Sequence, residues 1–508
     1  MHRIATCVLG LLTATSAIAS PGLPATGTAE GIEAGESIRA DARESVVKIF
    51  ATYRGPQFQS PWSKSAPDEY TGTGFVIEGN RILTNAHVVE QSSQIFIQPP
   101  GSADRLRANL VAISRGIDLA VLELRRESER VAFHASHPPL ELKPELPKIG
   151  GTVQAFGYPL GGEQISITEG VVSRIEYADY YQQVYGLRVQ VDAALNPGNS
   201  GGPVLMGDQV IGVTFSGMDQ AENIGYLIPA EEVRAFLDDV EDGEYDGHPT
   251  LMAERWQTAE NEALRDWLGL KPEHTGPIYV DDKEDLPLEL WDLVDSIAGT
   301  DIDNDGLVTI EDGVRVSWAY LIPRSITDGT IDVTVVRKGE RMDLKLPVTN
   351  NRNRLISYLG NDYPEYFVLG PLVFSPISLD HLEEYYPPYL TITKSPLISR
   401  IDDSPKFEGE ELVVVASPFL PHPIAKGYEI AYRPTVKAIN DTPIRSLEHM
   451  LSVIRDLDDD FIVFSFHDTA QETLVFDREE LLEATEEILE DNSIRRQGSK
   501  RFMDIWED

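Results

Sequence analysis

The chain has 508 residues, of which 42% are hydrophobic and 25% are charged, a balance typical of a soluble globular protein rather than a disordered one. A chain of this length is too long for one hydrophobic core, so we expect roughly two to four domains. The net charge of −40 argues against nucleic acid and anionic membrane surfaces as partners. We attribute the acidity to solubility or to a salty medium.

The N-terminal segment is predicted to be a signal peptide covering residues 1–19. It combines Arg3 with a short apolar run and the small-residue pattern Ala17–Ala19, which predicts cleavage after residue 19. The run is too short to span a bilayer, so we expect no membrane anchor after cleavage. The chain's one cysteine, Cys7, lies in this segment, so the mature protein forms no disulfide. We therefore expect a periplasmic or secreted protein with a flexible N-terminus at 20–40.

Residues 41–240 are expected to form one mainly β domain. Short apolar runs with an alternating pattern begin near Ser45–Ile49 and are separated by glycine turns. Ala230–Val240 has apolar residues at helical spacing and is predicted to be a closing helix. The acidic, glycine-containing segment at 238–249 follows as a linker.

A glycine-rich segment inside this domain, LNPGNSGGP at Leu195–Pro203, is arranged around Ser200. Neighbouring glycines allow a sharp turn that presents the hydroxyl and directs the N–H groups of Gly198 and Ser200 to one point. Two such donors stabilise the oxyanion of a tetrahedral intermediate in acyl transfer. Taken alone, the segment is also compatible with an ordinary glycine loop.

A serine nucleophile needs a base that is oriented by a third group. His87 comes at the end of an apolar run in TNAHVV, and Asp118 stands directly before the apolar run LAVL. The chain order His87, Asp118, Ser200 is the order of chymotrypsin-type enzymes. The alternatives for each residue alone are a core histidine, an aspartate at a strand start and a serine in a turn.

Four motifs, TGTGFVI, TNAHVV, DLAVLEL and NPGNSGGPV, resemble in this order the HtrA (Deg) family of ATP-independent serine proteases. The resemblance implies a chymotrypsin-like double β-barrel followed by two PDZ-like α+β domains. It implies that His87 is the general base, Asp118 its orienting carboxylate and Ser200 the nucleophile. The oxyanion hole would come from the N–H groups of Gly198 and Ser200, with Asn199 assisting. The implied mechanism requires no cofactor and no metal.

The primary substrate pocket is expected to be apolar. Ala194, six residues before the nucleophile, would close its floor, and the strand residues Ile224, Gly225, Tyr226 and Leu227 resemble the family's pocket wall. A charged side chain would lose its solvation there without gaining a partner. We therefore expect cleavage after small or medium aliphatic residues.

The resemblance places a first PDZ domain at 241–350. Strand, helix and hairpin patterns alternate there, and WDLVDSIAGTDIDNDG and VSWAYLI match a family turn and the helix after it. The peptide-binding loop would fall near Pro249–Ala253, without the usual glycine. Asp301–Asp312 also fits the spacing of an EF-hand calcium loop, although position 12 is aspartate and Gly313 interrupts the exit helix.

Residues 351–508 resemble a second, divergent PDZ domain. KAINDTPI followed by the helix SLEHMLSVI matches that branch of the family. The final DREELLEATEEILED predicts an acidic helix that docks on the domain through apolar residues including Leu481 and Ile488.

Two functions remain open at this point. The first is an exported ATP-independent serine endopeptidase that cleaves unfolded or damaged proteins, forms a trimer-based homo-oligomer and uses its PDZ domains to control assembly and access. The alternative is a periplasmic chaperone or PDZ scaffold with weak or dormant protease activity. A binder with the trypsin fold and no chemistry would normally carry a damaged triad.

Overall fold

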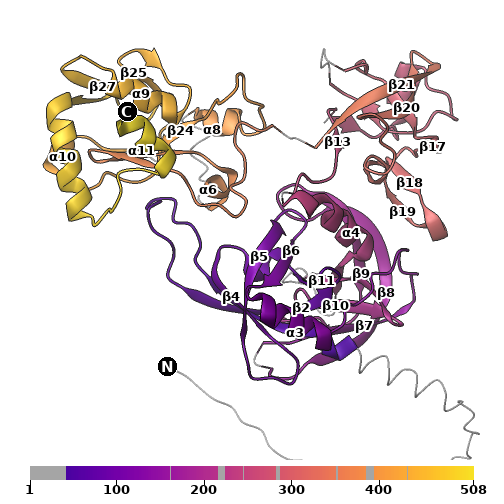
Figure 1. Cartoon of the computed structure of the whole chain (residues 1–508). Helices are drawn as coiled ribbons and strands as arrows, with labels where there is room; N and C mark the ends of the chain where they lie inside the picture. The colour runs from indigo at the N-terminus through magenta and orange to yellow at the C-terminus, as the bar shows by residue number, and fades with distance from the viewer. Residues whose placement is uncertain are drawn as a thin grey trace, which may run out of the picture. The chain divides into compact units, whose positions relative to one another are not determined.

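The computed structural model describes residues 42–160, 162–215, 224–243, 245–253, 255–281, 286–350, 353–384, 394–431 and 433–507 (Figure 1). The predicted signal peptide, Cys7 and the flexible N-terminus at 20–40 lie outside these residues. In the part of the chain that the structure describes, no helix is long and apolar enough to cross a membrane.

The N-terminal strands close into a barrel in the order β1-β2-β3-β6-β5-β4. Alternate residues such as Val47 and Ile49 are fully buried inside it, as the period of two in the sequence predicts. Gly79 and Asn80, both with positive φ, form the turn between β2 and β3. The elements are β1 (Val46–Tyr53), β2 (Asp68–Ile77), β3 (Arg81–Thr84), α2 (Ala86–Val89), β4 (Ser92–Gln98), β5 (Leu106–Ser114), β6 (Leu119–Leu124) and α3 (Glu127–Ser136).

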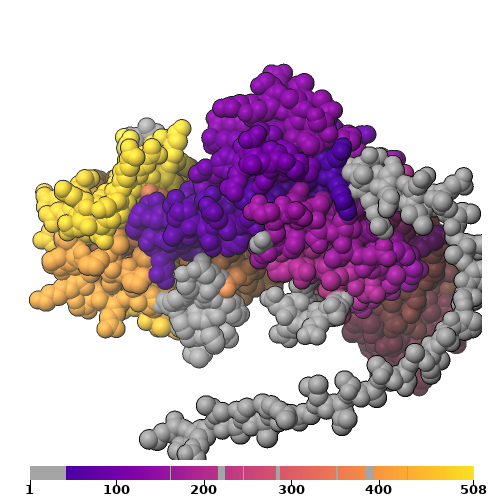
Figure 2. All heavy atoms as spheres, turned by 90° about the horizontal axis from the view of Figure 1, so that it is seen from below, coloured from indigo at the N-terminus to yellow at the C-terminus, as the bar shows by residue number. Residues whose placement is uncertain are grey.

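A second closed barrel follows, in the order β10-β11-β12-β9-β8-β7. Side chains from both barrels meet in one core, which includes Phe75 from β2 and Val213 from β11. In Figure 2 the indigo and magenta atoms of the two barrels accordingly adjoin. The elements are β7 (Thr152–Gly157), β8 (Ser166–Asp179), β9 (Tyr185–Val191), β10 (Pro203–Met206), β11 (Gln209–Phe215), β12 (Gly225–Pro229), α4 (Ala230–Asp239) and the 3-10 turn η1 (Val240–Asp242).

Helix α4 confirms the predicted closing helix, and its Val233 and Phe236 are buried. Helix α3 was not predicted. Its sequence, ESERVAFHAS, is mostly polar, and only Phe133 is buried. The apolar periodicity that marks a helix in a sequence is therefore almost absent from it.

The middle part contains a seven-stranded sheet. The predicted hairpin is present: Arg337 pairs with Glu340 across Lys338 and Gly339, both with positive φ. The elements are β13 (Thr250–Leu251), β14 (Trp256–Gln257), α5 (Glu262–Leu268), β15 (Ile278–Tyr279), β16 (Leu293–Ile297), β17 (Thr300–Asp301), β18 (Leu307–Thr309), η2 (Glu311–Gly313), β19 (Arg315–Ser317), η3 (Trp318–Leu321), β20 (Thr330–Arg337) and β21 (Glu340–Thr349).

One expectation for this part differs from the structure, and the candidate calcium loop lies beside it. VSWAYLI does not form an α-helix: Val316 pairs with Val308 in a hairpin, and only a 3-10 turn, η3, follows. The second half of the candidate calcium loop, from Leu307 to Asp312, lies in this hairpin, and the turn in its first half lies between the strands β17 and β18 rather than between helices. The carboxylate of Asp303 bonds there to Arg315 and accepts the N–H of Leu307.

The C-terminal part combines a three-stranded sheet and a four-stranded sheet around one core, which includes Phe374 and Phe464. Helix α10 confirms the predicted acidic helix and buries Leu481 and Ile488. Helix α11, which the sequence did not predict, contributes the fully buried Phe502. The elements are β22 (Phe367–Leu369), β23 (Leu372–Pro376), α6 (Leu379–Glu384), α8 (Pro396–Ser399), β24 (Val413–Val415), η4 (Pro423–Ala425), β25 (Val436–Ile439), β26 (Thr442–Pro443), α9 (Leu447–Arg455), β27 (Phe461–Phe466), β28 (Leu474–Asp477), α10 (Arg478–Asp491) and α11 (Lys500–Glu507).

Candidate active site

The first barrel brings His87 and Asp118 together. His87 lies on the short helix α2, which follows β3, and Asp118 precedes β6, the strand that pairs with β3. The Oδ2 atom of Asp118 lies 2.7 Å from Nδ1 of His87, and its Oδ1 atom accepts the backbone N–H of His87 at 2.9 Å. The Asn85 side chain donates to the backbone carbonyl of Asp118 at 2.9 Å. Both carboxylate oxygens of the buried Asp118 therefore bond to His87 and fix its backbone and its ring.

This contact changes the protonation of His87. Burial lowers the pKa of the imidazole, but the charge and hydrogen bond of Asp118, together with the charge of Glu90, outweigh it, and the pKa is raised above its ordinary value. With Nδ1–H directed at Asp118, the neutral ring leaves Nε2 free of a proton. A histidine in this state can accept a proton from a hydroxyl near neutral pH.

Ser200 lies on the loop before β10 of the second barrel and is buried, with 7% of its surface exposed to solvent. Gly198 has φ +98°, so the loop turns sharply two residues before the serine. The backbone N–H of Thr73, on β2 of the first barrel, donates to the Ser200 carbonyl at 2.9 Å. The Thr73 hydroxyl donates to the Gly198 carbonyl at 2.7 Å and accepts the N–H of Tyr158 at 2.9 Å.

Thr73 therefore donates to two loop carbonyls, those of Gly198 and Ser200, which lie on either side of Asn199. Among the residues that the structure describes, no acceptor is bonded to the N–H of Gly198 or Ser200. Within the same residues, no hydrogen bond joins His87 to Ser200, and the Asn199 side chain is buried beside Gly157.

Sequence reasoning missed Thr73 and Thr214 as site residues. The Thr214 hydroxyl bonds to the Asn199 carbonyl and accepts the N–H of Gly202 at 3.0 Å. Thr73 stands in the recognised motif TGTGFVI, but the motif does not show which backbone groups its side chain contacts. Thr214, in VIGVTF, reads as an ordinary strand residue, and no sequence signal marks it.

The predicted pocket residues have different exposures. Ala194 and Ile224 are exposed, whereas Gly225, Tyr226 and Leu227 on β12 are buried. Leu227 is part of the second barrel's core, and the guanidinium of Arg188 lies 4.3 Å from the centre of the Tyr226 ring.

The carboxylate of Asp192, two residues before Ala194, accepts the N–H of Val171 at 2.6 Å. In the described residues, no group of three or more histidine, cysteine, aspartate or glutamate side chains is arranged to hold a metal ion.

Comparison with known proteins identifies two conserved domain types. A model of the trypsin-like peptidase domain matches residues 72–213, which include His87, Asp118 and Ser200. A PDZ-domain model matches residues 357–501.

The chain is 33% identical to "Protease Do-like 2, chloroplastic" of Arabidopsis thaliana, over 91% of this chain and 76% of that protein. It is also 33% identical to "Protease Do-like 4, mitochondrial" of the same plant, over 83% of this chain and 79% of that protein. A solved structure, "HtrA-type protease AlgW with tripeptide", matches 62% of this chain and 96% of its own with 21% identity and a TM-score of 0.48. The extent of the match to the Do-like relatives shows that this chain belongs to the HtrA/Deg family of Do-like proteases and is a serine endopeptidase.

Proposed function

We propose that the chain cleaves unfolded or damaged proteins by an acyl-enzyme mechanism in which Ser200, His87 and Asp118 act together. The observation that carries this proposal is the 2.7 Å contact between Asp118 Oδ2 and His87 Nδ1, with the carboxylate buried. Such a pair orients the imidazole and stabilises the imidazolium that forms during the reaction.

In this mechanism His87 Nε2 takes the proton of Ser200 Oγ as that oxygen attacks the substrate carbonyl carbon. The N–H groups of Gly198 and Ser200 stabilise the oxyanion. His87 then gives the proton to the leaving amine as the C–N bond breaks. A water molecule, deprotonated by the same imidazole, attacks the acyl-enzyme and releases the second product.

Digestion of unfolded casein by wild type and by Ser200→Ala tests this proposal. The Ser200→Ala variant should lose cleavage, while Ser128→Ala, an exposed serine on α3, should retain it. In wild type, a fluorophosphonate should label the peptide that contains Ser200. Cleavage by purified Ser200→Ala at the wild-type rate would overturn the assignment.

We propose a preference for small or medium aliphatic residues before the scissile bond, because Ala194 is small and uncharged and the segment 224–227 is apolar. A dominant preference for lysine, arginine or aspartate in a peptide library would contradict it.

We also propose export after signal cleavage, a PDZ domain at 241–350 and a trimer-based homo-oligomer whose C-terminal PDZ domain serves assembly. Membership of the family and the extent of chain beyond the barrels support this organisation. Light scattering of the full chain and of a truncation after residue 350 tests it, because the truncated particle should contain fewer subunits.

A further inference from the structure

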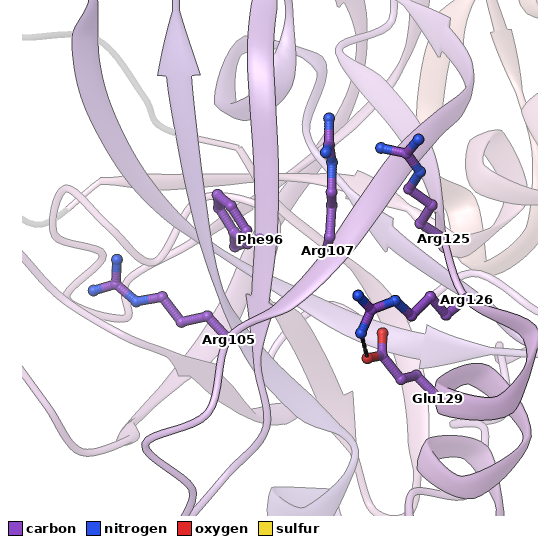
Figure 3. Close-up of a pocket in the computed structure, with 6 residues that line it drawn as sticks. All are labelled: Phe96, Arg105, Arg107, Arg125, Arg126 and Glu129. Carbon is purple, nitrogen blue, oxygen red and sulfur yellow. Dashed lines mark hydrogen bonds and ion pairs between the residues drawn. The ribbon is translucent and has the colours of Figure 1, made fainter.

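Four exposed arginines line one hollow on the first barrel, outside the proposed catalytic site (Figure 3). Arg107 lies at the start of β5 and Arg105 directly precedes that strand, whereas Arg125 and Arg126 come from the segment between β6 and α3. The hollow has a volume of about 460 Å³. It is lined by Phe96, Arg105, Arg107, Arg125, Arg126 and Glu129.

Two of these arginines are cross-strand neighbours. The N–H of Arg125 donates to the carbonyl of Arg107 at 2.8 Å, and the next residues, Ala108 and Leu124, are paired in the ladder. Figure 3 shows the two side chains extending in the same direction. Like charges directly opposite one another destabilise a pair of strands. Arg107 and Arg125 therefore repel each other across the two strands. An anion bound between their guanidinium groups would remove this repulsion.

The charges of this cluster are only partly neutralised by the protein. Within the described residues, no carboxylate forms an ion pair with Arg105, Arg107 or Arg125, whereas Arg126 contacts Glu129 at 2.8 Å. The chain nevertheless has 83 acidic and 43 basic residues. Unpaired arginines around a single hollow are therefore not explained by an excess of positive charge in the chain.

We propose that this arginine hollow binds a small, multiply charged oxyanion of the phosphate class. The planar guanidinium group presents paired N–H donors that match phosphate oxygens, and such charge-assisted bonds are strong. The Arg105 guanidinium lies 3.6 Å from the centre of the Phe50 ring, and Figure 3 shows its side chain extending away from those of Arg107 and Arg125, which are therefore the principal ligands. The volume falls within the usual range of small-molecule sites.

The overall charge favours a small ion over a long polyanion. A chain with a net charge of −40 repels an extended anion along its length. A small ion experiences mainly the nearby arginines, because charges beyond about 8–10 Å are screened at physiological salt.

Binding at this hollow should leave the catalytic chemistry unchanged and stabilise the fold. Asp118 precedes β6 and Arg125 follows it, so the length of this strand, Leu119–Leu124, separates the two sites. A ligand that binds only the folded protein raises its stability by mass action. We therefore expect pyrophosphate to raise the melting temperature of the full chain without changing peptide cleavage.

Isothermal titration of the full-length protein with pyrophosphate, at constant ionic strength set with sodium chloride, tests the proposal. Arg107→Gln and Arg125→Gln should each weaken binding by about tenfold, the effect of losing one charge-assisted contact. Glu129→Gln should tighten binding, since it removes the carboxylate that lines the hollow. A variant that merely damaged the fold would not show this opposite effect.

Arg445→Gln is the matched control, because Arg445 is also exposed and lies near an aromatic ring, that of Phe407, in the C-terminal part. It should bind pyrophosphate like wild type. Inorganic phosphate and glycerol phosphate, titrated in parallel, distinguish a free ion from a phosphoester. The proposal is overturned if wild type does not bind pyrophosphate, if Arg107→Gln and Arg125→Gln bind it as wild type does, or if citrate binds and pyrophosphate does not.

Discussion

The two halves of the candidate active site are built in different ways. In the first barrel, the side chains of His87 and Asp118 hold each other, with both carboxylate oxygens directed at one histidine. In the second barrel, the loop that carries Ser200 is held through its backbone carbonyls, which accept hydrogen bonds from Thr73 and Thr214.

This difference separates two requirements of the site. The acid–base half depends on the identity and protonation of two side chains. The nucleophile half depends on backbone conformation and on a contact between the barrels, since Thr73 belongs to β2 and Ser200 to the second barrel. Substitutions in the two halves should therefore have distinguishable effects on activity, pH dependence and stability.

The largest effect is expected for Asp118→Asn. The amide keeps the size of the carboxylate but cannot stabilise the imidazolium, and it favours the wrong tautomer of His87. By analogy with the serine-protease triad, kcat should fall by about 10⁴-fold. Cleavage of a short peptide, followed with stopped-assay chromatography, measures it. Asp208→Asn, at an exposed position between β10 and β11, is the control, and a loss below tenfold in Asp118→Asn would contradict this role.

Gly201→Ala should come next, with a loss of at least about 100-fold in kcat/KM, because a misplaced reacting group costs about that factor. Gly201 has φ +83°, and an added Cβ would lie 2.2 Å from the Thr73 carbonyl oxygen and 2.3 Å from Thr84 Oγ1. The loop must therefore move away from the first barrel.

Gly207→Ala separates steric displacement from backbone strain. Gly207 also has positive φ, +68°, but an added Cβ meets no atom within 4 Å. This control should lose about 1 kcal/mol of stability and keep its activity. Equal activity in the two alanine variants would show that the close approach of the loop to Thr73 is not needed.

The same division explains what the sequence could predict. His87, Asp118 and Ser200 stand in motifs whose residue types and order indicate their chemistry, and the closing helix and the hairpin at Lys338–Glu340 follow from apolar periodicity and turn residues.

The contributions of Thr73 and Thr214 could not be predicted, because each acts on carbonyl groups that any residue possesses. Helix α3 could not be predicted either, because it buries only Phe133 and its sequence therefore has no periodic apolar face. The helix predicted in VSWAYLI is limited to the 3-10 helix Trp318–Leu321, because the two residues before it, Val316 and Ser317, pair with β18.

A moderate effect is expected from pH. Burial lowers the pKa of His87, but the charge and hydrogen bond of Asp118 and the charge of Glu90 together raise it above its ordinary value. The neutral imidazole is the active base, so kcat/KM should rise with pH through a pKa above 6.5 and change about tenfold per pH unit below it.

The stability contribution of His87 has the opposite pH dependence. A raised folded-state pKa means that the protonated pair stabilises the fold below the unfolded pKa, and this stabilisation is lost as pH rises through the folded pKa. A kcat/KM profile with its midpoint below 6.5 would contradict the influence of Asp118 on the imidazole.

The smallest effect on activity is expected for Thr73→Val, which tests the contact between the barrels. Valine keeps the branched shape on β2 but removes the hydroxyl that bonds to the Gly198 carbonyl and the Tyr158 N–H. Two buried polar groups then lose a partner, at about 1–3 kcal/mol each in stability. If part of this cost falls on the loop that carries Ser200, kcat should drop by about tenfold at unchanged KM. Thr73→Ser keeps the hydroxyl and loses the methyl group, so its kcat should equal that of wild type. If the methyl group acted only by its shape, Thr73→Ser would lose activity instead. Equal kcat in wild type, Thr73→Val and Thr73→Ser would show that the backbone bond from Thr73 to the Ser200 carbonyl is sufficient to hold the nucleophile loop.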